Sequence, residues 1–96
     1  MHLVFTDDML RNAFESDVWH MALPADAKAD ISNILDDLAI AFSQTDIERI
    51  PFYQIEKVAE HELAIIVKGN TTHNLGCIGC LFDGGNVVVT FQAYAS

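Results

Sequence analysis

Apolar residues in the first half of the chain recur at spacings of three and four, which is the periodicity of a buried helix face. The first such series follows a short apolar run at residues 3–5, which we expect to form an edge strand. Thr6 is a suitable N-cap, and Asp7 and Asp8 place negative charge where a helix N-terminus favours it. The pattern predicts a helix near residues 7–20, with an apolar face made by Leu10, Ala13, Phe14, Val18 and Met21.

A second helix is predicted near residues 25–43. Pro24 separates it from the first, because the residue before a proline disfavours α geometry whereas proline itself suits a helix start. Its apolar stripe is long and regular, and consists of Ala27, Ile31, Ile34, Leu35, Leu38, Ala41 and Phe42. A polar stripe at spacings of four, three and four runs beside it and consists of Asp26, Asp30, Asn33 and Asp37.

The second half of the chain has the character of strands. Residues 63–67 form a β-branched apolar run that ends at Gly69-Asn70, and residues 75–82 form another apolar stretch, interrupted by two glycines. The Asp-Gly-Gly-Asn sequence at residues 83–86 is typical of a hairpin turn. In the last run, residues 87–94, one face is predicted to hold Val87, Val89, Phe91 and Ala93.

These elements predict one α+β domain spanning residues 1–96. Two N-terminal helices pack on one face of a three- to five-stranded, mostly antiparallel sheet. The length suits a single core, and with 51% hydrophobic residues that core needs no disulfide or metal to hold it. No apolar segment is long enough to span a membrane and no basic leader precedes one, so we expect a soluble, cytoplasmic protein that does not bind membranes.

The charge of the chain narrows its range of partners. Fourteen Asp and Glu stand against five Lys and Arg, a net charge of −9, and residues 1–49 hold ten of the acids with only three of the bases. Phosphate backbones are bound through several Lys and Arg side chains. Direct binding of nucleic acid is therefore disfavoured, unless Arg49, Lys57 and Lys68 converge in the fold.

The cysteines and histidines offer several chemistries, none of which the spacing favours. Cys77 and Cys80, with His61 and His73 before them, match no compact zinc module, and residues three apart in a strand point to opposite faces. A redox pair needs a helix N-terminus beside its first cysteine, whereas these cysteines lie in a predicted strand. A catalytic nucleophile such as Cys77, with His73 as base and Asp83 as acid, has no identifiable oxyanion site. The sequence thus predicts two buried structural cysteines, with no catalytic residues, no metal ligands and no cofactor.

The order strand, two helices, then antiparallel strands resembles the RelE/ParE toxin superfamily, including its phage-derived members. The likeness lies in Leu-Pro-Ala-Asp-Ala at residues 23–27, His-Glu-Leu-Ala-Ile at residues 61–65 and the hairpin at residues 82–89. The resemblance implies a ribonuclease that holds RNA with arginine and lysine on the sheet and in a basic C-terminal segment. Residues 75–80 and 92–96 contain no arginine or lysine. The resemblance therefore implies the fold of this superfamily, whereas the ribonuclease activity is in doubt.

The polar stripe of the second helix is the feature with the most functional content. Asp26, Asp30 and Asp37, with Asp36 beside them, are accompanied within the helix by one basic residue, Lys28. Solvated helix faces commonly mix Glu with Lys at a spacing of four, and an unbalanced acidic face repels itself. An ordinary solvated face remains one interpretation; the other is a binding surface for a basic protein partner. Trp19, if exposed, would be a suitable anchor for such a partner.

Three functions follow from this pattern. The first is a non-enzymatic binding protein, such as an inhibitor, neutraliser or phage-type blocker, that docks on a basic surface of a nucleic-acid-binding machine. The second is a RelE-like ribonuclease or its catalytically decayed relative. The third is a structural subunit or homodimer that associates through the edge of the strand at residues 87–94.

Overall fold

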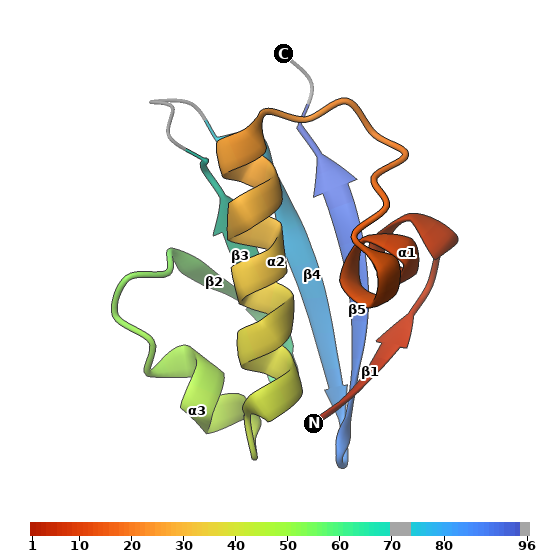
Figure 1. The fold of residues 1–96 in the computed structure, drawn as a ribbon. Helices are drawn as coiled ribbons and strands as arrows, with labels where there is room; N and C mark the ends of the chain where they lie inside the picture. The colour runs from red at the N-terminus through yellow and green to blue at the C-terminus, as the bar shows by residue number, and fades with distance from the viewer. Residues whose placement is uncertain (70–73, 95–96) are drawn as a thin grey trace.

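A mixed sheet of five strands, with three helices on one face, makes up the computed structural model, which describes residues 1–69 and 74–94 (Figure 1). The strands follow the spatial order β1-β5-β4-β3-β2. Along the chain the elements are β1 His2–Phe5, α1 Asp8–Ser16, α2 Ala25–Ile40, α3 Gln44–Glu48, β2 Ile55–Ala59, β3 Glu62–Val67, β4 Gly76–Asp83 and β5 Asn86–Ala93.

The pairing of the strands is antiparallel from β2 to β5 and parallel between β1 and β5. The α+β class is therefore as predicted, and the chain returns to its first strand after a continuous meander. The edges of the sheet are β1 and β2. The prediction that residues 87–94 form an edge was wrong for the first half of that run, because β1 pairs with β5 at residues 86–89. Among the described residues, no strand pairs with residues 90–93 on that side.

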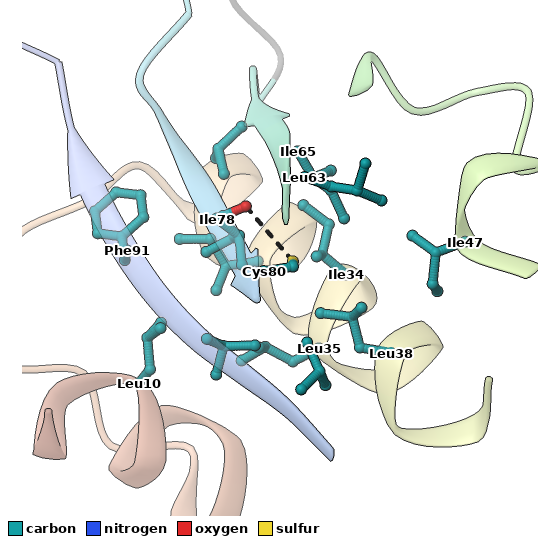
Figure 2. Close-up of a cluster of buried hydrophobic side chains, with 14 of the residues drawn as sticks. Leu10, Ile34, Leu35, Leu38, Ile47, Leu63, Ile65, Ile78, Cys80 and Phe91 are labelled. Atoms are coloured by element: carbon teal, nitrogen blue, oxygen red, sulfur yellow. Dashed lines mark hydrogen bonds between the residues drawn. The ribbon is translucent and has the colours of Figure 1, made fainter. Parts of the chain in front are cut away.

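The core lies between α2 and the sheet (Figure 2). The apolar stripe of α2 is buried as predicted, and its largest fully buried members are Ile31, Ile34, Leu35 and Leu38. Alternate residues of the strands face it, among them Leu63, Ile65, Ile78, Val87 and Val89. Each such side chain contributes about 1.5–3 kcal/mol on burial. This packing fixes which side of α2 faces the solvent.

The first helix is shorter than predicted. It ends at Ser16, because Asp17 adopts a left-handed conformation (φ 53°) and the N–H groups of Asp17 and Val18 bond to the carbonyls of Ala13 and Asn12. This is a hydrogen-bonded helix end that aspartate tolerates better than most residues. Val18 consequently leaves the helix and is 45% exposed, not buried on its apolar face.

The second helix also ends early, at Ile40, and the prediction that Phe42 belongs to its buried stripe was wrong. Ala41 is extended (φ −67°, ψ 145°), so Phe42 turns outward and is 95% exposed. Two polar groups stabilise the chain where it leaves the helix. The amino group of Met1 donates to the carbonyls of Ala39 (2.9 Å) and Ala41 (2.7 Å), where positive charge favours a helix C-terminus. The backbone N–H of Phe42 donates to Asp46 at 3.0 Å.

The unpredicted helix α3 follows this exit and seals one end of the core with Ile47, which is almost fully buried. Figure 1 shows α3 on the β2 side of α2, whereas α1 lies on the β1 side. Leu10 of α1 enters the same core from the opposite flank (Figure 2).

The hairpin between β4 and β5 confirms the turn prediction. Asp83 pairs with Asn86, and Gly84 between them has φ 60°, a conformation that glycine adopts without strain. Val87, Val89 and Phe91 are buried as predicted. Ala93, predicted on the same face, is exposed.

The second face of the sheet is not covered by any element that the described residues form (Figure 1). We call it the open face. Register places Cys77, Gly79 and Leu81 of β4 on it, since Ile78, Cys80 and Phe82 alternate into the core. Within residues 1–69 and 74–94, no helix has the length and apolar character needed to cross a membrane.

The two glycines of β4 differ in the space around them, so the substitution of each glycine tests the packing. A Cβ on Gly76 would lie 2.4 Å from the Gln92 carbonyl oxygen and 2.9 Å from the Phe91 ring, whereas one on Gly79 would meet only the Thr90 carbonyl oxygen at 3.7 Å. Gly76→Ala should therefore lower the free energy of unfolding by about 1–3 kcal/mol, as overpacking does. Gly79→Ala should be neutral or stabilise by up to about 1 kcal/mol. Urea unfolding measures both, and equal losses would contradict this packing.

Candidate functional site

A cleft of about 390 Å³ lies beside the polar stripe of α2. The helix contributes Asp30, Asn33, Asp36 and Asp37 to it. The opposite wall is the segment before β2, with Phe52, Tyr53 and Gln54, and the end of β3 with Lys68. Spacings of three and four bring the helix residues onto one side, and burial of the apolar stripe turns that side toward the cleft. We call this surface the acidic cleft.

Tyr53 ties the two walls together. Its hydroxyl donates to the Asp37 carboxylate at 2.5 Å. Partial burial of the ring raises the pKa of Tyr53 well above its ordinary value; the hydrogen bond to Asp37 and the nearby charges of Asp37, Asp30 and Asp36 raise it further. The phenol therefore stays protonated and keeps donating at neutral pH. Asp30, Asp36 and Asp37 thus all lie near enough to the phenol to affect its pKa.

Asp30 has a structural partner. Its carboxylate accepts a hydrogen bond of 2.8 Å from the backbone N–H of Gly69, which stands in the left-handed region at φ 61°. A Cβ at Gly69 would come within 3.2 Å of the Ala27 backbone nitrogen, so the chain passes close to α2 here. This bond holds the end of β3 against the helix. Asn70, which we expected to complete the turn, lies outside the described residues.

Asp26 and Asp36 differ from these two, because both are exposed. Among residues 1–69 and 74–94, neither has a hydrogen-bond or ion-pair partner, and the ion pairs found there are Arg11–Asp8, Lys57–Glu48 and the marginal His61–Glu60. Asp36 lines the cleft, whereas Asp26 lies nearer the N-terminus of α2, outside its lining. The cleft thus offers Asp36 and the free lone pairs of Asp30 and Asp37 to a ligand.

Two aromatic residues of the cleft were missed by sequence reasoning. Phe52 is 76% exposed and stacks edge-on with Tyr53, their ring centroids 4.8 Å apart. The sequence analysis assigned no element to this segment, and the signal it offered was two adjacent aromatic residues after Pro51. An exposed ring beside carboxylates suits a guanidinium or ammonium group, which is attracted both to the ring face and to the acids.

Trp19 lies apart from this cleft. It is on the connection between α1 and α2, half-buried against the core, and its indole N–H donates to Asp17 at 3.0 Å. The structure thus brings together Asp30, Asp36 and Asp37 of the predicted binding residues and leaves Trp19 elsewhere. Its role as an anchor for a partner stays a prediction.

The cysteines lie on opposite faces of β4. Cys80 is in the core, where its thiol contacts the carbonyl oxygen of Ile78 at 3.6 Å (Figure 2), and Cys77 is buried on the open face with Ala64 and Ile66. Burial, with a smaller effect of Cys77, raises the pKa of Cys80 to about 12, so its reactive thiolate is scarcely populated. His73 lies outside the described residues. In the part of the chain that the structure describes, no group of three His, Cys, Asp or Glu could hold a metal ion.

No known protein family model matches this chain, and no curated protein matches it.

The Tyr53–Asp37 bond makes a pH-dependent prediction. Because the folded-state pKa of Tyr53 lies above its unfolded value of about 10, its stabilisation is complete below that pH and is lost as the pH rises beyond it. Tyr53→Phe should lower the free energy of unfolding by about 1 kcal/mol at neutral pH. The difference from the unmodified protein should shrink above about pH 10. Urea unfolding at a series of pH values measures it; a difference that does not change with pH would contradict the assignment.

Proposed function

We propose that this protein is a non-enzymatic binding protein that docks on a basic surface of a protein partner through its acidic cleft. The observation that carries the proposal is the meeting of Asp30, Asp36 and Asp37 with the exposed ring of Phe52 in one cleft. Carboxylates and an aromatic face together suit arginine, which bonds acids through its fork of donors and stacks on rings. An inhibitor or neutraliser of a nucleic-acid-binding protein would need this complementarity.

The surface next to the cleft adds an apolar component to the expected partner. Ile40, which ends α2 one turn after Asp36, is strongly exposed, and so is Phe42 beyond it. On the outward side of α2, acidic residues are therefore followed by apolar residues toward the C-terminus of the helix. A partner segment that carries arginine in one part and leucine or a similar residue in the next would complement both the acidic and the apolar part of this surface.

Asp26 and Asp36 are the residues to substitute, since both are exposed and neither bonds to a described residue. Asp26→Asn with Asp36→Asn should weaken binding of a synthetic arginine–leucine amphipathic peptide by about threefold to tenfold, or roughly 0.7–1.4 kcal/mol. Added salt should weaken binding to the unmodified protein, because screening acts on exposed charges. Isothermal titration measures both effects.

The matched control removes two charges elsewhere. Glu15→Gln with Glu60→Gln changes the net charge equally, and both residues are exposed and distant in sequence from α2. This control should leave the affinity within about twofold, because neither residue lines the acidic cleft and exposed charges are screened by salt. Equal losses in the two double variants would show only nonspecific attraction to an acidic chain and would contradict a site on α2.

The second candidate is a RelE-type toxin fold without the basic residues of a ribonuclease. The resemblance stays a prediction; the supporting observation is the order of elements, with one strand, helices and then four antiparallel strands. The outward residues of β5, where a nuclease of that type needs basic groups, are Val88, Thr90 and Gln92. We expect that induced expression in bacteria neither arrests growth nor cleaves messenger RNA. Growth arrest with cleaved messenger RNA would reinstate the enzyme.

A further inference from the structure

The open face carries an apolar ridge beside a hollow. The register places three apolar side chains side by side across β1, β5 and β4; this apolar ridge consists of Val4, Val88 and Leu81. Leu81 is 48% exposed, which is high for a large apolar residue in the middle of a sheet. Two residues along β4 stands Gly79, which pairs with Ala64 on one side and Thr90 on the other. The ridge thus borders a row in which β3, β4 and β5 carry no large side chain.

The hollow over Gly79 has a volume of about 440 Å³. Leu81, Val88 and Thr90 are part of its wall. A Cβ at Gly79 would meet only a carbonyl oxygen at 3.7 Å, so packing within the chain does not require glycine here. Glycine in a strand interior costs stability, and one that the fold does not need often marks a close approach by another group. The hollow has room for one aliphatic side chain from outside.

The distribution of acidic residues indicates which partners can bind the open face. Ten of the fourteen acidic residues precede residue 50, on the helices and their connections, whereas only four lie in the sheet half of the chain. On the open face, Glu62 of β3 pairs with Leu81 and lines the hollow, Glu56 of β2 stands at the end of the row of Gly79, and Asp83 lies at the hairpin end. The outward side chains of β1 and β5 carry no carboxylate. This face therefore carries fewer carboxylates than the helix side, where most of the acidic residues lie.

We infer that the open face binds a second copy of this chain in a two-fold dimer. A two-fold axis that lies between the two sheets and crosses β4 at right angles over Cys80 places each Leu81 opposite the partner's Gly79. The ridge of one copy then enters the hollow of the other, which is the self-complementarity that an isologous interface requires. The helices and their acids remain on the outside of both copies.

The size of the face suits such an interface. Five strands about 4.8 Å apart, with central strands of eight residues, span roughly 20 by 25 Å. Standard interfaces bury roughly 800 Å² per partner, which is of the same order. The dimer would leave both acidic clefts exposed, so it does not depend on the proposed function and does not obstruct it.

Sedimentation equilibrium of the full chain tests the dimer with two opposite changes. Gly79→Val fills the hollow in a strand position that accepts a Cβ, and Leu81→Asp puts a charge on the ridge. Each should raise the dissociation constant of the dimer by about tenfold or more, the loss expected for a central apolar contact. Circular dichroism and urea unfolding verify that both variants remain folded.

Two matched controls distinguish this face from other exposed apolar residues. Phe42→Asp adds the same charge on the helix side, and Phe52→Asp adds it beside the acidic cleft. Both should leave the dissociation constant within about twofold, because neither residue meets the partner. Loss of the dimer in Phe42→Asp or Phe52→Asp but not in Leu81→Asp would place the interface on the helix side and overturn the inference.

The dependence on salt concentration distinguishes this dimerisation from binding of a basic partner. Screening should strengthen a dimer of two −9 chains, whereas it should weaken a complex held by opposite charges. A chain that stays monomeric at every concentration and salt level overturns the dimer and leaves the acidic cleft untouched. A dimer whose dissociation constant is unchanged by both Gly79→Val and Leu81→Asp overturns it as well.

Discussion

Burial of the apolar stripe of α2 against β3, β4 and β5 is the interaction on which the rest of this structure depends. Four large aliphatic residues of the helix are fully buried there, and with about 1.5–3 kcal/mol for each they exceed any polar contact in the molecule. The packing also fixes the rotation of the helix about its axis. Once that rotation is set, the carboxylates between the buried positions must face the β2–β3 side, where they form the acidic cleft.

Two polar contacts then adjust the position of the helix against the sheet. Asp30 accepts from the N–H of Gly69 at the end of β3, and Asp37 accepts from Tyr53 before β2. Hydrogen bonds to charged groups contribute about 1.5–3 kcal/mol at most, so they orient elements that burial has already joined. They also divide the acidic stripe into two kinds of residue. Asp30 and Asp37 support the fold, while Asp36 and Asp26 are exposed and bond to no other residue that the structure describes.

The fold class, the buried face of α2 and the β4–β5 hairpin could be predicted from the sequence because each depends on local periodicity or on a turn of fixed chemistry. The ends of the helices could not, since Asp17 and Ala41 stop them through backbone conformations that no periodicity records. The parallel pairing of β1 with β5 joins residues more than 80 positions apart, and only the assembled sheet shows it. For the same reason the acid residues of the site were predicted, whereas Phe52 and Tyr53, which reach it through tertiary packing, were not.

The two faces of the molecule thus differ: an acidic cleft lies beside exposed apolar residues on the helix side, and an apolar ridge lies beside a hollow on the sheet side. The central claim is that a basic partner binds the helix side. Backbone amide chemical shifts of the labelled protein, recorded during titration with the arginine–leucine peptide, test it most directly. The account predicts shifts concentrated in the second half of α2 and in residues 52–54, with β5 unchanged. Shifts concentrated at Val88, Thr90 and Gln92, or spread evenly over the acidic residues of α1 and α2, would contradict it.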